Sequence, residues 1–433
     1  MKRTLLFVAL ILCCCNPDNP GDVGTPGEEV PPAFADYQRV ELSSRITGVQ
    51  PMTGIVLWTS NSRCRTDNIQ LEYSYVRYSD VCKNKDEYDW ASVDNLLKEI
   101  ASRGHQAVIR FYYVYPGYSA AVPDYIKSWE GYEATIGKSE GKETEFPDWR
   151  CDELRRFHLE FYRRFAERYD NDPRLAFLET GFGLWAEYHI YDGPFVEGKT
   201  FPSKSFQAEF FRKMEGWFQN TPWCISIDAA DQKYGPFQAD PIMLTVRFGN
   251  FDDSFMCSDH DGYNYSSWLF FGEERYKRAP LGGEFSYYTD DDQKHCLDYN
   301  GIHGRTFEAE VAKYHMTFII GNDQPQYQPM SRIKEASMAM GYRFVIRDYR
   351  IKQGEGAAIL IENTGVAPIY RDAFVSVDGE RGSYNLRELM PGSQAWIGIE
   401  CPSVTASSSV SIECDHLVTG QRIGYEAAVS LGD

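Results

Sequence analysis

The sequence predicts an α/β protein in which a (β/α)8 TIM barrel is followed by a small all-β sandwich domain. The chain has 433 residues, enough for an α/β barrel of roughly 250 residues and an accessory domain. Strand-like apolar runs alternate with helical patterns through its middle, and only short β-like runs follow from about Phe344. We therefore expect the barrel over residues 36–343 and the sandwich over residues 344–433.

The N-terminus has the pattern of a bacterial lipoprotein signal. Lys2 and Arg3 precede an apolar run over residues 5–12, and three cysteines follow it. The run is far shorter than the roughly 20 apolar residues of a spanning helix, which disfavours an uncleaved membrane anchor. We expect a signal peptide over residues 1–15 with lipidation at Cys15, or alternatively at Cys14. The predicted protein is exported and held by its lipid at the bacterial outer membrane or cell surface.

The next segment has the composition of a linker. Residues 16–35 are rich in Pro, Gly and acidic residues and lack periodic apolar positions. Such segments do not bury enough apolar surface to fold. We expect a flexible tether between the lipid and the barrel.

The barrel prediction depends on eight strand-like runs, most of which precede a helical or long loop segment. The clearest helix covers residues 152–170, where Leu154, Phe157, Phe161 and Phe165 recur at three- or four-residue spacing. Strands that alternate with helices form parallel sheets, and eight such units favour a closed barrel. The expected strands are 54–60, 71–81, 107–114, 175–181, 224–229, 244–248, 281–287 and 317–321, and the expected helices are 89–103, 152–170, 206–219, 307–315 and 332–342.

The C-terminal part has a different pattern of apolar residues. Short apolar runs recur between turns rich in Gly, Asn, Asp or Pro, and no helical pattern intervenes. This pattern is typical of a β-sandwich. The expected strands are 357–361, 373–377, 395–399, 409–412 and 427–431.

Composition narrows the class of ligand. The 44 Lys and Arg residues against 63 Asp and Glu residues give a net charge of −19. Nucleic acid is therefore not an expected partner, since phosphate binding requires clustered cations. Aromatic residues make up 15% of the chain, which suits a carbohydrate binder but equally suits a large apolar core.

The cysteines indicate neither a metal nor a cofactor. Eight cysteines follow Cys15, and none has the CxxC or Cys/His spacing of a zinc site. Export permits disulfides, and proximity in sequence makes Cys64–Cys82 and Cys401–Cys414 candidate pairs. The connectivity stays open, and no cofactor is expected.

Two glutamates follow or end predicted barrel strands at positions where the loops build active sites. Glu187 follows the fourth strand in the segment GFGLWAEYH, and Glu284 lies on the seventh in PLGGEFSYY, after Gly282 and Gly283. A glycosidase needs one carboxyl group to protonate the leaving oxygen and a second to attack or to activate water. Nearby aromatic side chains raise a carboxyl pKa, and Gly282 and Gly283 would let a sugar approach the backbone.

These segments resemble a known superfamily. The two glutamates at the ends of strands four and seven are similar to those of clan A glycoside hydrolases, and GFGLWAEYH, GNFDDSF and GGEF resemble segments of uncharacterised secreted bacterial barrels with a trailing β domain. The resemblance covers most of the chain from about Gly54. It implies that Glu187 is the general acid/base and Glu284 the nucleophile of a retaining glycosidase. The clan usually has Asn before its acid/base, whereas this chain has Ala186.

Other polar and aromatic residues at the strand ends are candidates for substrate binding. They are Trp58, Tyr75, Arg77, Arg110, Tyr112, Trp185, His189, Asp228, Asp252, Asp253 and Asn322, with His260 and Gln324 as weaker candidates. Packing, ion pairing and capping are the structural alternatives for each of them. Glu179 is an alternative acid, although its position within the fourth strand also suits a buried ion pair.

Three functions remain compatible with the sequence. The first is a surface-anchored glycosidase that acts on a polysaccharide or its oligosaccharides. The second is a carbohydrate-binding lipoprotein that has lost the chemistry, which Ala186 favours. The third and weakest is a polysaccharide lyase, in which Tyr112 would be the base and Arg110 would bind a uronate. The sequence contains no GxSxG, HExxH or P-loop motif.

Overall fold

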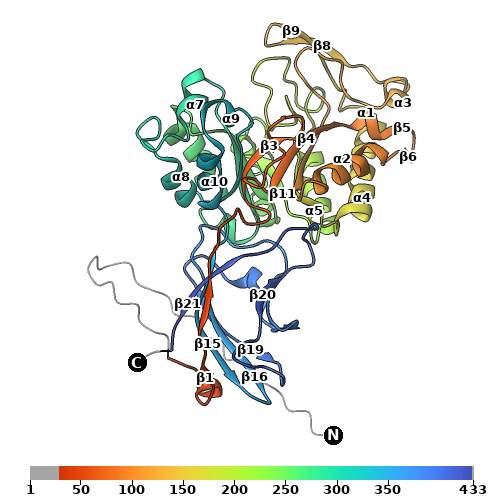
Figure 1. Cartoon of the computed structure of the whole chain (residues 1–433). Helices are drawn as coiled ribbons and strands as arrows, with labels where there is room; N and C mark the ends of the chain where they lie inside the picture. Colours follow the sequence, from red (N-terminus) through yellow and green to blue (C-terminus); the bar gives the residue numbers. More distant parts are fainter. Residues whose placement is uncertain (1–28, 432–433) are drawn as a thin grey trace. The chain divides into compact units, whose positions relative to one another are not determined.

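The computed structural model describes residues 29–431 and divides them into two compact units (Figure 1). The larger unit comprises residues 51–341 and 416–421, and the smaller unit comprises the remaining described residues. The predicted signal peptide, with Cys14 and Cys15, lies outside the described residues. Among the residues described, no helix combines the length and the apolar character needed to cross a bilayer.

The larger unit is the predicted barrel. Eight parallel strands close on themselves in chain order, and their pairing ends with β14 beside β3. This arrangement confirms the predicted fold class. The strands are β3 (Gly54–Trp58), β4 (Leu71–Arg77), β7 (Gln106–Tyr112), β10 (Leu175–Glu179), β11 (Trp223–Ser226), β12 (Gly249–Phe255), β13 (Leu281–Phe285) and β14 (Met316–Ile320).

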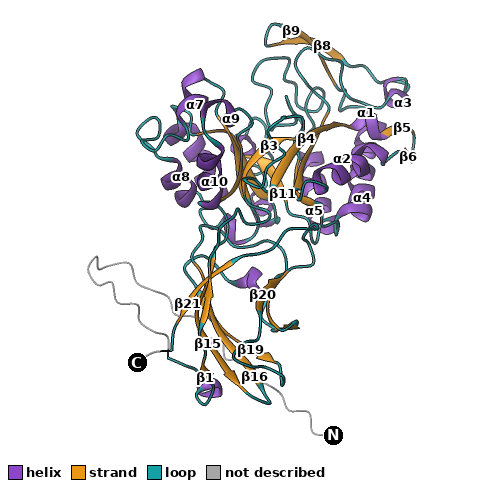
Figure 2. Ribbon diagram, in the orientation of Figure 1, coloured by secondary structure: helices purple, strands orange, loops and turns teal. Residues whose placement is uncertain are grey.

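Helices cover the outside of the barrel (Figure 2). In α4, Phe157, Phe161 and Phe165 are fully buried, as their spacing predicts. The helices are α1 (Tyr78–Val81), α2 (Ala91–Ala101), α3 (Asp124–Lys127), α4 (Asp152–Tyr169), α5 (Lys204–Trp217), α6 (Tyr265–Phe271), α7 (Asp290–His295), α8 (Phe307–Lys313), α9 (Gln324–Tyr327) and α10 (Met330–Met338). Short helical turns are η2 (Ile227–Ala230), η3 (Pro241–Thr245), η4 (His260–Asn264) and η5 (Arg275–Lys277).

The sixth strand begins later than predicted. Residues 244–248 were expected to form it, but β12 covers Gly249–Phe255 and Pro241 opens a short helical turn instead. The guanidinium group of Arg275 donates hydrogen bonds to the carbonyls of Leu244, Val246 and Phe248. These carbonyls are therefore satisfied by a side chain and do not need a neighbouring strand.

Two other barrel segments differ from their predicted form. The second strand ends at Arg77, and α1 takes up the residues predicted to continue it. The long segment after the third strand contains a hairpin of β8 (Thr135–Ser139) and β9 (Lys142–Phe146), visible at the rim in Figure 1. Its tip contacts the segment after the fourth strand, because the Tyr191 hydroxyl donates to Glu140. A two-stranded sheet of β5 (Cys82–Asn84) and β6 (Glu87–Tyr88) lies between α1 and α2 in sequence.

The barrel interior is filled by rings. Phe177 stacks on Phe318 with ring centroids 4.8 Å apart, and Phe251 lies beside Phe318. A Cβ atom on Gly282 would come within 2.3 Å of the Phe318 ring. The Gly282–Gly283 pair was expected to let a sugar approach the backbone, but at Gly282 the missing side chain makes room for Phe318 instead.

The smaller unit contains two sheets, as expected for the β domain. The larger sheet has the order β19-β16-β15-β21-β2, with β1 also paired to β15, and the smaller has the order β18-β17-β20. The strands are β1 (Gln38–Arg39), β2 (Leu42–Ser44), β15 (Phe344–Lys352), β16 (Gly356–Asn363), β17 (Phe374–Val377), β18 (Glu380–Arg381), β19 (Gln394–Glu400), β20 (Val410–Glu413) and β21 (Tyr425–Val429), with a short turn η6 (Leu386–Glu388).

The N-terminal boundary of the barrel differs from the prediction. The barrel was expected to begin at residue 36, but β1 and β2 pair with β15 and β21 of the smaller unit. The last residues of the predicted tether are structured. They form the short helical turn η1 (Pro32–Phe34), and the Phe34 ring lies against Trp396. The segment joins the sheet through backbone pairing, and Arg39 also forms an ion pair with Asp348 of β15.

The candidate disulfides are not formed. Cys64, Cys82 and Cys401 carry buried free thiols, so neither Cys64–Cys82 nor Cys401–Cys414 is a bridge. Cys64 lies next to Ile69 and Leu297 in the apolar cluster around α8 and α10, whereas Cys82 packs with the cluster around α4. Proximity in sequence therefore does not bring the first two thiols together.

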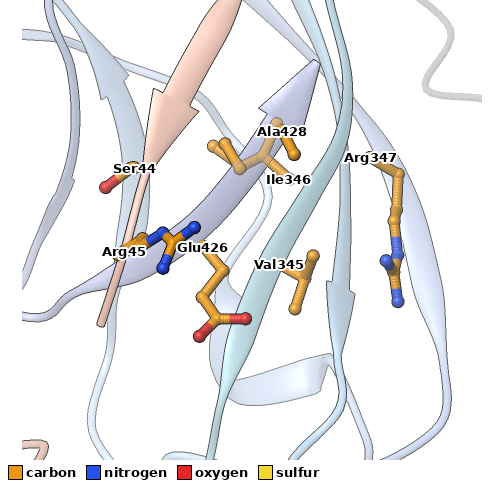
Figure 3. A pocket seen from close by; sticks show the side chains of 8 residues that line it. Ser44, Arg45, Val345, Ile346, Arg347, Glu426 and Ala428 are labelled. Carbon is orange, nitrogen blue, oxygen red and sulfur yellow. The ribbon is translucent and has the colours of Figure 1, made fainter. Parts of the chain in front are cut away.

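The smaller unit also contains a hollow of about 500 Å³ (Figure 3). Strands β2, β15 and β21 line it, and the polar side chains on its walls are Ser44, Arg45, Arg347 and Glu426. Arg347 is engaged with Glu362 at 2.7 Å. The hollow contains none of the glutamates predicted to be catalytic.

Candidate active site

The candidate active site forms at the carboxyl ends of the barrel strands, where side chains from different strands converge on Arg110. Successive side chains of a strand point to opposite faces, so alternate residues enter the barrel. Arg110 of β7 enters it and is 2% exposed. Its Nε lies 2.9 Å from Glu179 Oε2, and its Nη1 and Nη2 donate to Asp253 Oδ1 at 3.2 Å. Its Nη1 also lies 3.9 Å from Glu187 Oε1.

Below these carboxylates, Arg110 rests on an aromatic ring. Its guanidinium carbon lies 4.6 Å from the centroid of Phe251, on the strand that also carries Asp253. A buried cation is costly unless it is paired and hydrogen-bonded. Here β10 and β12 both supply carboxylates to it, so one arginine links three strands of the barrel.

Glu187 lies on a tight loop that follows the fourth strand. The amides of Phe182 and Gly183 both donate to the Glu187 carbonyl, and the Glu187 amide donates to Leu184. A Cβ atom on Gly181 would come within 2.0 Å of the Ala186 carbonyl oxygen, so the backbone crosses itself there. The glycines of the GFG segment thus serve the loop's own packing.

The same loop stores backbone strain next to the glutamate. Trp185 and Ala186 have φ angles of 52° and 59°, in the left-handed region that non-glycine residues seldom occupy. Strain of this kind occurs at functional sites when the surrounding structure enforces it. Ala186 is 1% exposed, so this position does not present a side chain to a substrate. It therefore does not replace the asparagine of the clan.

His189 joins Glu187 to a further carboxylate. Its Nε2 lies 3.0 Å from Glu187 Oε2, and its Nδ1 lies 2.5 Å from Asp228 Oδ2. Burial alone would lower the pKa of His189, but Asp228 and Glu187 outweigh it and raise this pKa well above its usual value. Burial would raise the pKa of Asp228, but His189 outweighs it and holds this pKa below its usual value. His189 is therefore an imidazolium between two carboxylates.

Glu284 has a different environment. It lies near the carboxyl end of β13. Among residues 29–431 it makes no hydrogen bond or ion pair. Burial raises the pKa of Glu284 to about 8, and the nearby carboxylate of Glu187 adds to the rise. At neutral pH, Glu284 therefore carries a proton.

The two carboxyl groups beside Arg110 also hold protons more tightly than usual. Burial raises the pKa of Glu179 to about 7, although Arg110 counteracts it. Burial and Glu187 raise the pKa of Asp253 well above its usual value. The alternative prediction for Glu179, a barrel-interior partner of a cation, matches its contact with Arg110 and its complete burial.

Aromatic side chains form the walls of the site. The Tyr75 ring lies edge-on to Trp58, Tyr112 and Tyr115, with centroids 5.7 to 6.2 Å apart. Trp185 lies edge-on to Tyr115 and stacks on Tyr191. The predicted residues Trp58, Tyr75, Tyr112 and Trp185 thus belong to one continuous aromatic wall, which suits stacking on sugar faces.

Other predicted residues have structural contacts. Arg77 leaves the barrel, is 56% exposed and pairs with Asp80. Asp252 points to the outer face of β12, where Trp268 Nε1 and Asn264 Nδ2 donate to it. Asn322 accepts from the Trp58 amide and from Asn61, so it holds two strand ends together.

The weaker candidates likewise have buried partners. His260 lies between Asp252 and Glu310, with nitrogen–oxygen distances of 3.6 and 3.5 Å. Gln324 donates to the Gln293 carbonyl. Among the described residues, neither His260 nor Gln324 forms an ion pair or hydrogen bond with the carboxyl groups around Arg110.

Four residues at the site were not predicted. Ser226 donates to Asp228 at 3.2 Å, Tyr263 lowers the Asp228 pKa by hydrogen bonding, Asp323 raises the Glu284 pKa, and Tyr73 packs edge-on to Tyr75. Ser226 and Tyr73 fall on inward positions of their strands, two residues from Asp228 and Tyr75, so alternation alone would have identified them. Tyr263 comes from a distant turn that no pattern in the sequence marks.

A metal centre is not evident in the part of the chain that the structure describes, where no three His, Cys, Asp or Glu side chains are grouped to hold an ion. The chemistry available is therefore that of the side chains themselves. They supply a protonated carboxyl group, a carboxylate beside two cations, and an aromatic wall.

Comparisons with known proteins identify similar folds only. No family model and no curated protein sequence matches the chain. Similar solved structures include a GH5_18 protein from Bifidobacterium longum, with 9% identity over 63% of this chain and 71% of that one and a TM-score of 0.39. A family 30 subfamily 8 xylanase from Clostridium acetobutylicum has 10% identity over 84% and 98%, with a TM-score of 0.39.

A third similar structure is the catalytic domain of the β-amylase of Paenibacillus polymyxa, with 11% identity over 67% of this chain and 99% of that one and a TM-score of 0.42. Because the identities and TM-scores of these structures are low, only the side chains of this chain bear on its activity.

Replacing Arg110 by Met should destabilise the barrel most at alkaline pH. Loss of one partner of a buried ion pair costs about 3–5 kcal/mol. Glu179 has a folded pKa of about 7, above its unfolded value, so the wild-type protein loses stability as pH rises to about 7. Arg110 counteracts this rise of the pKa, so without Arg110 the pKa of Glu179 is higher still and the loss of stability continues above pH 7. The loss of unfolding free energy in Arg110→Met should therefore be larger at pH 8 than at pH 5, measured by chemical denaturation.

Arg77→Met is the matched control, since its exposed ion pair contributes about 0–1 kcal/mol. An Arg110→Met loss that is as small as that of Arg77→Met, or that is equal at both pH values, would contradict the account of Arg110 given above.

Proposed function

We propose that the protein is a glycoside hydrolase that cleaves glycosidic bonds in a polysaccharide or oligosaccharide, with Glu187 and Glu284 as its two catalytic carboxyl groups. The observation that carries the proposal is the contrast between these glutamates at one end of the barrel. Glu187 lies beside His189 and Arg110, whereas Glu284 is half-buried, forms no ion pair among the described residues and has a pKa of about 8. A glycosidase uses one carboxyl group to donate a proton and a second as nucleophile or base, and two carboxyl groups in such different surroundings suit that division of roles.

The charge of the site favours a neutral or amino sugar as substrate. Six carboxyl groups surround it, and its two cations are already engaged: Arg110 with Glu179 and Asp253, and His189 with Glu187 and Asp228. A uronate carboxylate would meet repulsion and no available cation. This disfavours the lyase alternative, because Arg110 is not available to bind a uronate.

The resemblance to clan A supports a retaining mechanism, in which one carboxylate attacks the anomeric carbon. The aromatic wall of Trp58, Tyr75, Tyr112 and Trp185 supplies stacking surfaces for the sugar. The alternative, a carbohydrate-binding lipoprotein without turnover, retains the support of Ala186, which does not supply the clan's asparagine amide.

Sugar release from a panel of neutral, amino-sugar and uronate polysaccharides tests the proposal. Wild type should release sugar from a neutral or amino-sugar member, and Glu187→Gln and Glu284→Gln should each reduce release by about 100-fold or more, because each removes a catalytic carboxyl group. Chromatography measures the products, and NMR of the first-formed anomer reports retention.

Glu274→Gln is the matched control, because Glu274 is exposed and pairs only with Lys277. Release that survives both active-site variants would refute the assignment of the two glutamates. Binding of a glycan without release by wild type would support the binding alternative, and an unsaturated product that absorbs ultraviolet light would support the lyase.

We also propose that the protein is exported and anchored by a lipid on Cys15. The support is the pattern of residues 1–15, a basic start and a short apolar run that ends in cysteines. An anchored enzyme would act at the cell surface on glycans that are too large to enter the cell.

Growth of a bacterium that expresses the full chain with a labelled fatty acid tests the anchor. The label should appear in the protein and be lost in Cys15→Ala, with the protein released from the membrane fraction. Labelling that persists in Cys15→Ala but is lost in Cys14→Ala would move the site to Cys14, and the absence of label in wild type would refute the anchor.

A further inference from the structure

We infer that the substrate is an extended glycan chain, and that the sugar units beyond the cleaved bond stack on a platform of aromatic rings at the rim of the barrel. The platform consists of Tyr115, Tyr118, Trp185 and Tyr191, and the hairpin of β8 and β9 holds it in place. The inference rests on the proposed glycosidase function and adds to it a second binding surface and the length of chain that the site selects.

The platform continues from the aromatic wall of the site. The Tyr115 ring lies edge-on to Tyr75, with centroids 6.2 Å apart. Its other neighbours are the Tyr118 ring at 5.5 Å and the Trp185 ring at 6.3 Å. Trp185 in turn stacks on Tyr191 at 6.1 Å. Ring contacts therefore connect the interior of the barrel with two rings at its surface.

The two outermost rings of the platform are open to solvent. Tyr118 is 65% exposed and Tyr191 is 56% exposed. A single exposed ring is common, but exposed apolar surface that continues from one side chain to the next marks an interaction site. A tyrosine ring presents an apolar face to the C–H groups of a sugar while its hydroxyl stays hydrated. An oligosaccharide fits this surface, and its occupant follows from its continuity with the candidate active site.

The rim hairpin fixes both outermost rings. The Glu145 amide of β9 donates to the Tyr118 carbonyl at 3.2 Å. At the hairpin tip, Glu140 accepts from the Tyr191 hydroxyl at 2.6 Å, and the Glu140 amide donates to Asp192 at 2.5 Å. A surface that is ordered before binding loses little conformational entropy when the ligand arrives. The hairpin thus makes the platform a preformed surface.

The platform lies next to both glutamates of the proposed reaction. The Tyr191 ring is edge-on to His189 at 5.1 Å, and His189 Nε2 lies 3.0 Å from Glu187 Oε2. Burial raises the pKa of Tyr115, and the nearby Glu284 adds to the rise. A glycan held between Glu187 and Glu284 therefore meets Tyr115 and Tyr191 as soon as it extends over strands three and four.

Exposed tyrosines elsewhere on the rim do not form such a series. Tyr287 and Tyr288 follow β13, and Tyr263 lies in η4. Among residues 29–431, none of these three rings packs against another aromatic ring. Consecutive sugar units thus find adjacent rings on the side of strands three and four, and this asymmetry gives the bound chain its direction.

Chain-length dependence tests the inference. For the sugar found in the panel, the kcat/KM of wild type should rise from the disaccharide to longer oligosaccharides, because each further unit contributes binding energy. Tyr118→Ala and Tyr191→Ala should each lower kcat/KM by about 10-fold on the longest oligosaccharide, mainly through KM, and far less on the disaccharide. Tyr118→Phe should keep most of the rise, since the ring makes the contact.

Tyr299→Ala is the matched control, because Tyr299 is also exposed and its hydroxyl donates to a glutamate, Glu335, at 2.7 Å outside the site. A loss that is equal on the disaccharide and the longest oligosaccharide would overturn the inference and leave the glycosidase in place. A wild-type kcat/KM that does not depend on chain length would do the same.

Calorimetric titration with the longest oligosaccharide separates the platform from the proposed function, since binding needs no turnover. An affinity that Tyr118→Ala lowers by about 10-fold, in a wild type that releases no sugar, would refute the hydrolase and keep the platform. An affinity that Tyr118→Ala leaves unchanged would refute the platform, and the absence of binding and release with every glycan of the panel would refute both.

Discussion

The buried charge of Arg110 is the constraint around which the site is organised. A guanidinium group inside a barrel requires carboxylates, and β10 and β12 supply Glu179 and Asp253 for this purpose. Phe251 supports it from below. Arg110 donates hydrogen bonds to Asp253 and forms an ion pair with Glu179, and it lies 3.9 Å from Glu187. Arg110 therefore contributes positive charge to the site, and recognition of the sugar falls to the aromatic wall.

The loop after the fourth strand adds a second constraint. Its crossing backbone places Glu187 and His189 next to each other, at the expense of two residues in the left-handed region. Asp228 of the neighbouring strand end completes the contact with His189. The result is a chain of alternating charges from Asp228 to Arg110, whereas Glu284 on β13 stands apart from the cations. Burial is then the largest cause of its raised pKa, and the nearby carboxylate of Glu187 adds to it.

Sequence patterns identified the barrel and most of the converging side chains, because both depend on local periodicity. The stripe of Phe157, Phe161 and Phe165 and the strands that carry Arg110 and Glu284 were predicted from it. The predictions that were wrong concern segments whose structure depends on partners far away in the sequence. Arg275 satisfies the carbonyls of the expected sixth strand, and the register of β12 then decides that Asp253 points inward and Asp252 outward. A shift of one residue exchanges the faces of a strand, so the sequence left these two aspartates equivalent.

The central claim is that Glu284 is protonated in the resting protein at neutral pH, because burial and the nearby carboxyl groups oppose its ionisation. Infrared difference spectroscopy between wild type and the Glu284→Gln variant at pH 6.5 tests this claim directly and needs no substrate. We expect Glu284→Gln to remove a carboxylic acid C=O band, whereas the control Glu274→Gln, at an exposed ion pair with Lys277, should remove only a carboxylate band. Loss of only a carboxylate band in Glu284→Gln would contradict the claim.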